Sequence, residues 1–179
     1  MEIQTHTVIF EHGKTKIFVN TMPKLAAGLL LFRKRNNGVE VLLVHPGGPF
    51  FKNKDNGSWS IPKGEANAEE KILFEVAKRE FCEETGHTIH EADFFDFLGS
   101  VKRKDGKCVS VWAFEGDLDP SMIKSNEISI EWPPKSGKMI CIPEVDRCQF
   151  FSLDLARKKL VLYQVPILDK FEQIYKNLS

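Results

Sequence analysis

Residues 64–86 read GEANAEEKILFEVAKREFCEETG, and this stretch decides the fold. Its segment 68–85 contains no Gly or Pro and is rich in Glu, Lys, Ala and Leu, which favour helices. Gly86 stands where a helix commonly ends, because glycine adopts the left-handed conformation without strain. We therefore predict one helix over residues 68–85.

Three glutamates continue the apolar face of this helix. At about 100° per residue, Glu80, Glu83 and Glu84 fall on the same face as the apolar side chains that should pack on a sheet, namely Ile72, Leu73, Val76 and Ala77. Such closely spaced like charges repel, and Arg79 alone cannot neutralise them. A hard divalent cation, Mg²⁺ or Mn²⁺, would resolve the conflict. The alternative is an ordinary solvated run of charges.

Strand patterns flank this helix on both sides. Residues 26–34 and 39–45 are apolar and flank an Asn-Gly turn at Asn36, Asn37 and Gly38, which is typical of a hairpin. Residues 93–104 and 107–116 flank a second such turn, Asp105-Gly106. Helical segments are expected at 152–160 and 166–177, and a surface loop over 117–143. Strands and helices mixed in this way predict an α/β sandwich.

The domain boundary is expected near Met22. Residues 1–21 alternate around Gly13 like a short hairpin, which is either an N-terminal extension or an extra strand pair. The remaining residues, 22–179, are expected to form a single domain, since their length suits one hydrophobic core.

Composition excludes several classes of protein. The 25 basic and 25 acidic residues give zero net charge, which makes nucleic acid an unlikely partner. The apolar run 25–32 is too short for a bilayer, which takes about 20 residues. The N-terminus lacks the pattern of a secretory signal, and the four cysteines form no C-x-x-C pair. We therefore expect a cytoplasmic protein with reduced thiols and no membrane contact; nothing indicates the oligomeric state.

Residues 79–86, REFCEETG, carry a resemblance to a known family. They match the signature of the Nudix hydrolases, in which Arg-Glu, an apolar residue, any residue, Glu-Glu, any residue and Gly follow one another. Two departures exist: eight rather than seven residues separate Glu70 from Arg79, which leaves the role of Glu70 open, and His87 replaces an apolar residue. The flanks AGLLLFRK, EVLLVHPGG and WSIPKGE are also similar to asymmetrical dinucleoside tetraphosphate hydrolases and bacterial predicted NTP pyrophosphohydrolases.

The resemblance implies a Nudix α/β/α sandwich with a central mixed sheet. It also implies that Mg²⁺ or Mn²⁺ is held by Glu80, Glu83, Glu84 and the carbonyl of Lys63, and that Arg79 orients a glutamate. Many members supply a further carboxylate from a loop, and Glu144 occupies that place here, with two alternatives in Glu127 and Glu131. The implied reaction is hydrolysis of a pyrophosphate bond in a nucleoside diphosphate linked to a group X. The general base is left open between Glu83, Glu84 and Glu144.

Several residues are candidates for contacts with a small-molecule nucleotide. Lys63 and the cluster Lys102, Arg103 and Lys104, with Lys107, could bind phosphates, although a hairpin end is commonly charged for solubility alone. Phe50, Phe51 and Trp59 could stack on a nucleobase or simply anchor the glycine-rich loop. The favoured substrates are dinucleoside polyphosphates or NTPs. The alternatives are a Nudix-fold module that senses a nucleotide without cleaving it, and an enzyme that hydrolyses RNA ends.

Overall fold

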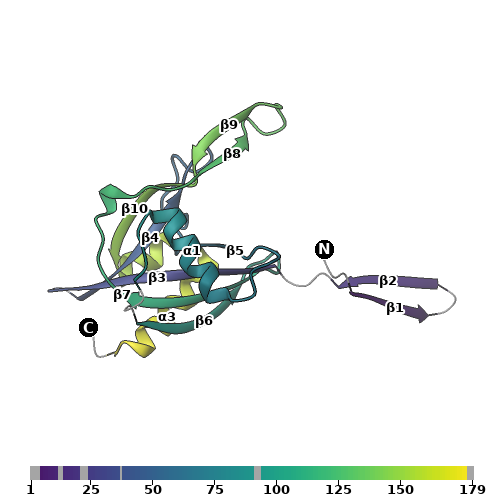
Figure 1. Ribbon diagram of the computed structural model, residues 1–179, viewed down its shortest axis with the longest axis horizontal. Coiled ribbons are helices and arrows are strands. Elements are labelled where there is room, and N and C mark those ends of the chain that lie inside the picture. Colours follow the sequence, from purple (N-terminus) through teal and green to yellow (C-terminus); the bar gives the residue numbers. More distant parts are fainter. Residues whose placement is uncertain (1–4, 12–13, 21–23, 37, 91–93, 177–179) are drawn as a thin grey trace.

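A computed structural model describes residues 5–11, 14–20, 24–36, 38–90 and 94–176 (Figure 1). The main sheet has six strands. Five of them lie in the order β10-β4-β3-β7-β6. The sixth, the short strand β5, pairs with the N-terminal part of β3, whereas β4 pairs with the C-terminal part of β3. Its strands are β3 (Leu25–Arg35), β4 (Gly38–Pro46), β5 (Lys63–Glu65), β6 (Phe95–Lys102), β7 (Cys108–Glu115) and β10 (Val145–Ser152). The pair β3–β7 is parallel and the other pairs are antiparallel, so the sheet is mixed as expected.

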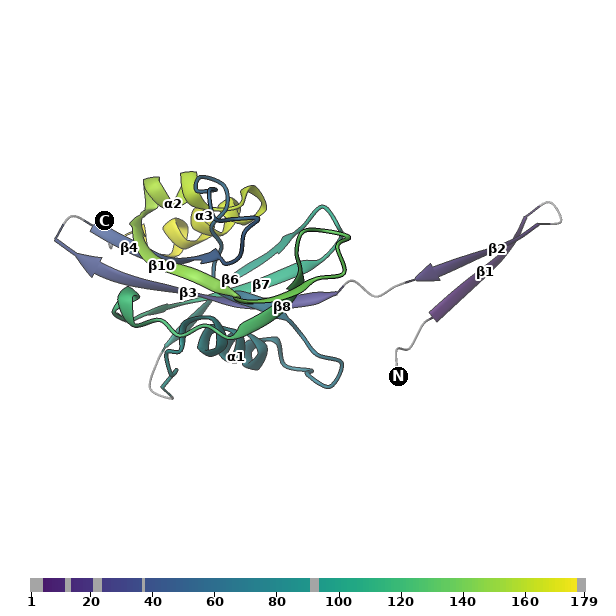
Figure 2. The same ribbon diagram turned by 90° about the horizontal axis from the view of Figure 1, so that it is seen from above.

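Helices cover both faces of this sheet. Helix α1 (Leu73–Thr85) lies on one face, and α2 (Leu153–Lys159) and α3 (Val165–Ile174) lie on the other (Figure 2). Strand β3 is buried over most of its length because its alternate side chains enter two separate hydrophobic cores, one beneath α1 and one beneath α2 and α3. The predicted α/β/α sandwich is confirmed.

The hairpins formed at the predicted places. Strands β3 and β4 pair up to Arg35 and Gly38, and Asn37 of the predicted turn lies outside the described residues. Strands β6 and β7 flank Asp105-Gly106, where Gly106 has a positive φ of 89°. The predicted N-terminal hairpin consists of β1 (Thr5–Glu11) and β2 (Lys14–Asn20), which form a separate two-stranded sheet (Figure 1); its turn residue Gly13 is outside the described part.

Helix α1 begins at Leu73, and the prediction that it begins at residue 68 was wrong. The preceding residues form a turn in which the backbone N–H of Asn67 donates to the Glu70 carboxylate and the N–H of Glu70 donates to the Asn67 carbonyl. Ile72 has an extended conformation at the helix N-cap. Helix propensity is therefore overridden here by the side-chain and backbone bonds of Glu70.

The segment 117–143 is not a plain loop, and that prediction was also wrong. It contains a 3₁₀ turn η1 (Pro120–Met122) and a projecting hairpin of β8 (Glu127–Glu131) and β9 (Met139–Pro143). The strands pair Ile128 with Ile142 and Ile130 with Ile140, so β-branched side chains oppose one another and favour the ladder. A second 3₁₀ turn, η2 (Leu162–Gln164), links α2 and α3. No helix in the described ranges has the length and apolarity needed to cross a bilayer.

We predict that Gly28→Ala will lower the free energy of unfolding by about 2 kcal/mol or more, the cost of overpacking. A Cβ at Gly28 would lie 2.4 Å from the carbonyl oxygen of Pro62, because β3 passes directly beneath the segment that leads into β5. Denaturant unfolding measures the change. The matched control is Gly116→Ala, whose Cβ would meet two side chains and no backbone atom, the end of Leu31 at 3.0 Å and a ring carbon of Phe114 at 3.8 Å. Equal losses in the two variants would contradict the prediction.

Candidate active site

Two of the three predicted site glutamates of helix α1 are buried against strand β5. Glu80 is 7% exposed and Glu84 is 4% exposed, whereas the Glu83 side chain is 36% exposed. The backbone N–H of Lys63 donates to Glu84 Oε2 at 3.2 Å. A Cβ at Gly64 would overlap the Glu80 carboxylate, 1.9 Å from its Oε2, so only glycine allows this approach. The prediction that the glutamates face inward therefore holds for Glu80 and Glu84.

Arg79 connects the glutamates of the helix with the segment before it. Its Nη1 donates to Glu80 Oε1 at 2.8 Å and to Glu83 Oε2 at 2.9 Å, and its Nε donates to Glu70 Oε1 at 2.7 Å. These carboxylates, with Glu70 first, raise the pKa of Arg79. Glu70, whose role the sequence left open, is thus the third carboxylate that pairs with Arg79, alongside Glu80 and Glu83. The extra residue does not prevent this pairing, because the segment before Leu73 is a turn rather than helix.

Burial makes the charge on Glu84 costly. Desolvation raises the pKa of Glu84 to about 8, and the nearby carboxylates of Glu144 and Glu80 add to the increase, against the opposing effect of Lys63. Desolvation also raises the pKa of Glu80, despite its ion pair with Arg79. A cluster of buried carboxylates of this kind is typical of a functional site.

A cavity of about 380 Å³ opens beside these carboxylates. Its walls include Glu80, Glu144, Lys63 and Arg103. Glu144 follows β9 directly; its N–H donates to the Asn126 carbonyl, and its own carbonyl accepts from the Gly47 N–H. The structure thus brings Glu144 to the helix glutamates. Glu127 and Glu131, the alternatives, lie on β8 and are not among the described residues that line this cavity.

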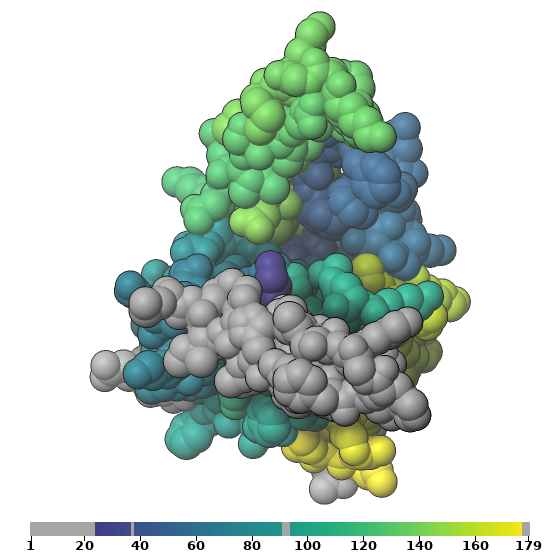
Figure 3. All heavy atoms as spheres, turned by 90° about the vertical axis from the view of Figure 1, so that its right-hand side faces the viewer, coloured from purple at the N-terminus to yellow at the C-terminus, as the bar shows by residue number. Residues whose placement is uncertain are grey.

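A second cavity, of about 760 Å³, adjoins the first and shares Lys63, Arg103 and Tyr163 with it. Its other walls include Phe51 and Lys104. Figure 3 shows this side of the molecule, where the β6–β7 turn (teal), the loop after β4 (blue) and the β8–β9 hairpin (green) surround a hollow. The two cavities are therefore neighbours on either side of these shared residues, and we refer to them together as the connected cavities: carboxylates line the smaller one, and aromatic and basic side chains line the larger one.

The loop that carries Phe51 is held by a buried histidine. His45, at the end of β4, is fully buried, and its ring nitrogens lie 2.7 Å from Asp146 Oδ1 and 2.9 Å from the Lys54 carbonyl oxygen. These contacts fix the loop to both β4 and β10, so the wall that Phe51 provides is anchored on two strands.

Some candidate binding residues lie elsewhere. Trp59 is 2% exposed, packs on Phe151 and donates its indole N–H to Asp55, so the structure does not bring it to a cavity wall. Phe50 is 58% exposed and packs against Phe51. Lys107, by contrast, lines the smaller cavity, where it forms an ion pair with Glu65. Tyr163, which lines both cavities, is not among the residues that the sequence predicted, because its ring lies beside Arg103, a residue distant in the chain.

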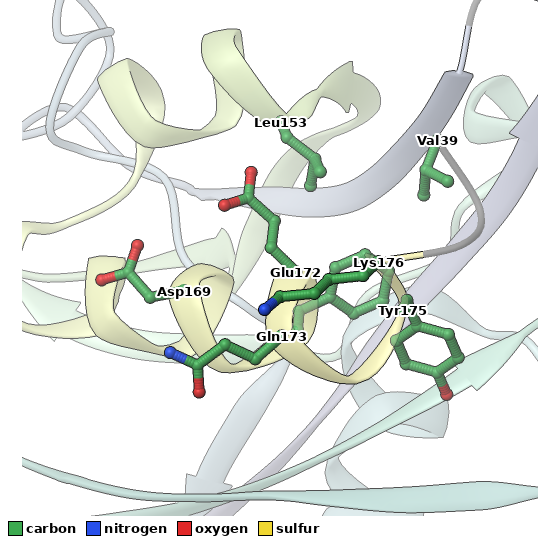
Figure 4. A pocket seen from close by; sticks show the side chains of 8 residues that line it. Val39, Leu153, Asp169, Glu172, Gln173, Tyr175 and Lys176 are labelled. Atoms are coloured by element: carbon green, nitrogen blue, oxygen red, sulfur yellow. The ribbon is translucent and has the colours of Figure 1, made fainter.

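A third cavity lies beside α3 (Figure 4), with a volume of about 730 Å³. Its acidic residues Asp169 and Glu172 already pair with Arg157. None of its described lining residues belongs to either of the other two cavities, and none is a candidate ligand for a metal. This cavity is therefore separate from the cluster of buried carboxylates.

The side chains present fit a hard divalent cation. Glu80, Glu83, Glu84 and Glu144 offer oxygen atoms only, which suits Mg²⁺ or Mn²⁺. Burial, and to a smaller extent repulsion from neighbouring carboxylates, raises the pKa values of Glu80 and Glu84, and a cation would offset both effects. Within the described ranges no group of acidic, His or Cys side chains is already gathered around one point. Arg79 already occupies one oxygen of Glu80 and one of Glu83, so a bound cation would compete with these bonds.

We predict that Glu84→Gln will stabilise the metal-free protein in alkaline solution. The pKa of Glu84 is higher in the folded than in the unfolded protein. The contribution of Glu84 to the free energy of unfolding therefore falls as the pH rises from the pKa of the unfolded state, 4.5, to that of the folded state, about 8. At pH 9 in the presence of a chelator, the free energy of unfolding of the variant should therefore be about 2 kcal/mol higher than that of wild type, and at pH 5 the two should differ little. Thermal unfolding at both pH values measures this. A variant less stable than wild type at pH 9 would contradict it.

Comparison with known proteins identifies the fold. The family model for the NUDIX domain matches residues 22–171, which is most of the chain. A curated relative, the 17.7 kDa protein encoded in the e-segB intergenic region of Enterobacteria phage T4, is 28% identical over 88 residues. That match covers 49% of this chain and spans 57% of the relative, a little over half its length.

Solved structures share the same architecture. The binary complex of Caenorhabditis elegans Ap4A hydrolase has a TM-score of 0.60 at 21% identity, covering 85% of this chain and 98% of that one. The MutT protein of Methanosarcina mazei has a TM-score of 0.58 at 21% identity, covering 89% and 99%. The NUDIX domain of Shewanella oneidensis NrtR, solved with ADP ribose, has a TM-score of 0.56 at 16% identity, covering 89% and 90%. At these identities the likeness concerns the fold.

Proposed function

This chain belongs to the Nudix family, and from that premise we propose that it hydrolyses a pyrophosphate bond in nucleoside diphosphates linked to a group X, with Mg²⁺ or Mn²⁺ as cofactor. The favoured substrates are dinucleoside polyphosphates such as Ap4A, followed by NTPs. One observation carries the proposal: Lys63, Arg103 and Tyr163 line both the cavity with the carboxylates and the cavity with the aromatic residues. A nucleotide in one cavity therefore presents its phosphates to the other.

The basic residues suit a polyphosphate. Lys63 and Arg103 lie at the junction of the two cavities, and Lys104 lines the larger one. Positive side chains at these places offset the repulsion between phosphate oxygens and the glutamates, and a bound cation would offset the rest. The zero net charge of the whole chain is thus compatible with a polyanionic substrate.

The aromatic residues suit a nucleobase. Phe51 and Tyr163 belong to the walls of the same cavity, whose volume of about 760 Å³ falls in the range of small-molecule sites, about 300–1,000 Å³. Rings of this kind stack on bases of any identity. The second nucleoside of a dinucleoside polyphosphate would then extend away from this cavity, beyond the carboxylates.

The glutamates supply the metal site and the base. Glu80, Glu83, Glu84, Glu144 and the Lys63 carbonyl would hold the cation, which when bound neutralises phosphate charge and makes water nucleophilic. Arg79 keeps the carboxylates in place through its bonds to Glu70, Glu80 and Glu83. For the general base we favour Glu144 over Glu83 and Glu84, because it lines the cavity, is only half-buried and is not among the carboxylates to which Arg79 donates.

The proposed activity is tested by product analysis with Mg²⁺ over Ap4A, NTPs, nucleotide sugars and NADH. Wild type should cleave at least one of them, and Glu80→Gln should lower kcat by about 10²- to 10³-fold because a charged group at the reacting centre is lost. The matched control is Glu75→Gln on the same helix, where Glu75 is exposed and pairs only with Lys78. Tight nucleotide binding without cleavage would favour the module that senses a nucleotide. Cleavage of an added 5′-triphosphate RNA, with none of the other compounds cleaved, would favour the enzyme that hydrolyses RNA ends.

We also predict that Phe51→Ala will raise KM for the nucleotide substrate about tenfold with a smaller change in kcat, since stacking on a base contributes roughly 1–3 kcal/mol. Steady-state kinetics measures both constants. Phe94→Ala is the control, because Phe94 is 92% exposed and lies outside the described walls of both cavities. An unchanged KM in Phe51→Ala would contradict the proposed place of the base.

A further inference from the structure

We propose that Gln164 is a positioning residue that sets which phosphorus atom of the substrate lies next to the carboxylates. The inference rests on the proposed function and deepens it. Gln164 is not among the described residues that line either cavity. It would therefore act through its two hydrogen-bond partners, Ile61 and Tyr163.

The Gln164 side chain is fully buried and bonded at both ends. Its Oε1 accepts from the backbone N–H of Ile61 at 2.9 Å, and its Nε2 donates to the hydroxyl of Tyr163 at 2.9 Å. A buried amide is retained only where its polar atoms have partners, since leaving one unpaired is costly. The side chain is therefore a fixed bridge between two parts of the chain.

One end of this bridge lies at Ile61, just before the Lys63 backbone that binds Glu84. Ile61 is followed by Pro62, whose carbonyl accepts from the Leu29 N–H at 3.1 Å, and then by Lys63, whose N–H donates to Glu84. Pro62 has a fixed φ, which limits the freedom of this segment. Displacement of Ile61 would thus move Lys63 relative to β3 and to the carboxylates.

The other end of the bridge lies at the wall of the substrate space. Tyr163 is half-buried, lines both connected cavities and lies below the guanidinium of Arg103, 5.8 Å from its ring centroid. Restraining the Tyr163 hydroxyl fixes the ring that would bind the base. Gln164 therefore connects the wall that binds the base with the backbone that holds the metal-binding glutamate.

Backbone bonds align the same two segments over several residues. The Trp59 N–H donates to the Lys159 carbonyl at 3.0 Å, and the Val161 N–H donates to the Trp59 carbonyl at 2.8 Å. The Gln164 side chain extends this ladder by one further bond, to Ile61, where η2 turns the backbone away. The backbone ladder holds the segments together, so loss of the Gln164 bridge should loosen the end nearest the site without separating them.

This connection bears on where hydrolysis occurs. The oxygen of water bonds to one phosphorus, the bridging P–O bond at that phosphorus breaks, the departing phosphate takes the electron pair, and a carboxylate accepts the proton from water. In Ap4A, attack at a phosphorus next to a nucleoside breaks the outer bridge and gives AMP and ATP. Attack at an inner phosphorus gives two ADP when the central bridge breaks and AMP with ATP when the outer bridge breaks, so two ADP form only by attack at an inner phosphorus. The distance from base to carboxylates selects between them, because small misplacements of reacting atoms change rates strongly.

The test is the ratio of these products from Ap4A and Mg²⁺, measured by chromatography. Wild type should give one product set almost alone. We expect Gln164→Met to raise the share of the other set roughly fivefold to tenfold, through loss of both bonds. Gln164→Glu, which keeps the acceptor for Ile61, and Tyr163→Phe, which keeps the ring, should each raise it by a smaller factor. Leu168→Ala, which shortens a buried side chain of helix α3, is the control for lost stability and should leave the product ratio unchanged.

Three results would overturn the inference. The product ratio could stay constant in the Gln164 variants and in Tyr163→Phe while overall activity falls, which would make the bridge merely structural. Leu168→Ala could shift the ratio as much as Gln164→Met, which would make the shift a general effect of loosening. Should Gln164→Met fail to fold, Tyr163→Phe decides alone, because it leaves the Ile61 bond intact. Absence of any Ap4A cleavage by wild type would overturn the favoured substrate together with this inference.

Discussion

The burial of the Glu80 and Glu84 carboxylates against Lys63 and Gly64 of strand β5 is the constraint on which the rest of the site depends. Glycine at positions 28 and 64 lets β3, β5 and helix α1 approach closely enough to exclude water. Exclusion of water raises the energy of both carboxylates, and Arg79 offsets only part of that cost. The fold thus keeps two carboxylates in an unfavourable environment, and the cation that we propose would relieve that cost.

The sandwich places the side chains that we propose for substrate binding around these two carboxylates. Strand β3 lies in the middle of the sheet and separates two cores, so the strand β5 that it supports is rigid. The β6–β7 turn brings Arg103, the loop after β4 brings Phe51, and η2 brings Tyr163. Each comes from a connection between elements rather than from their interiors, which is where binding residues commonly lie in proteins with a rigid scaffold.

Much of the fold and part of the site could be predicted because the signals were local. Helix α1, its end at Gly86 and the two hairpins follow from periodicity and turn residues within short windows. The β8–β9 hairpin was missed because its strands are short and separated by a Pro-rich tip. Trp59 looked like a loop aromatic, yet its side chain packs inward beside Phe151, and Tyr163 reaches the site only through contacts distant in sequence. Such long-range packing leaves no local pattern.

The most direct test of the central claim is a crystal structure of the protein soaked in Mn²⁺, with anomalous diffraction to locate the metal. The account predicts a peak bound by carboxylate oxygens of Glu80 and Glu84, at distances normal for a hard cation, about 2.0–2.3 Å. Arg79 should then have released at least one of its bonds to Glu80 and Glu83. A fully occupied peak elsewhere in the molecule, with both buried carboxylates still held as in the metal-free structure, would contradict it.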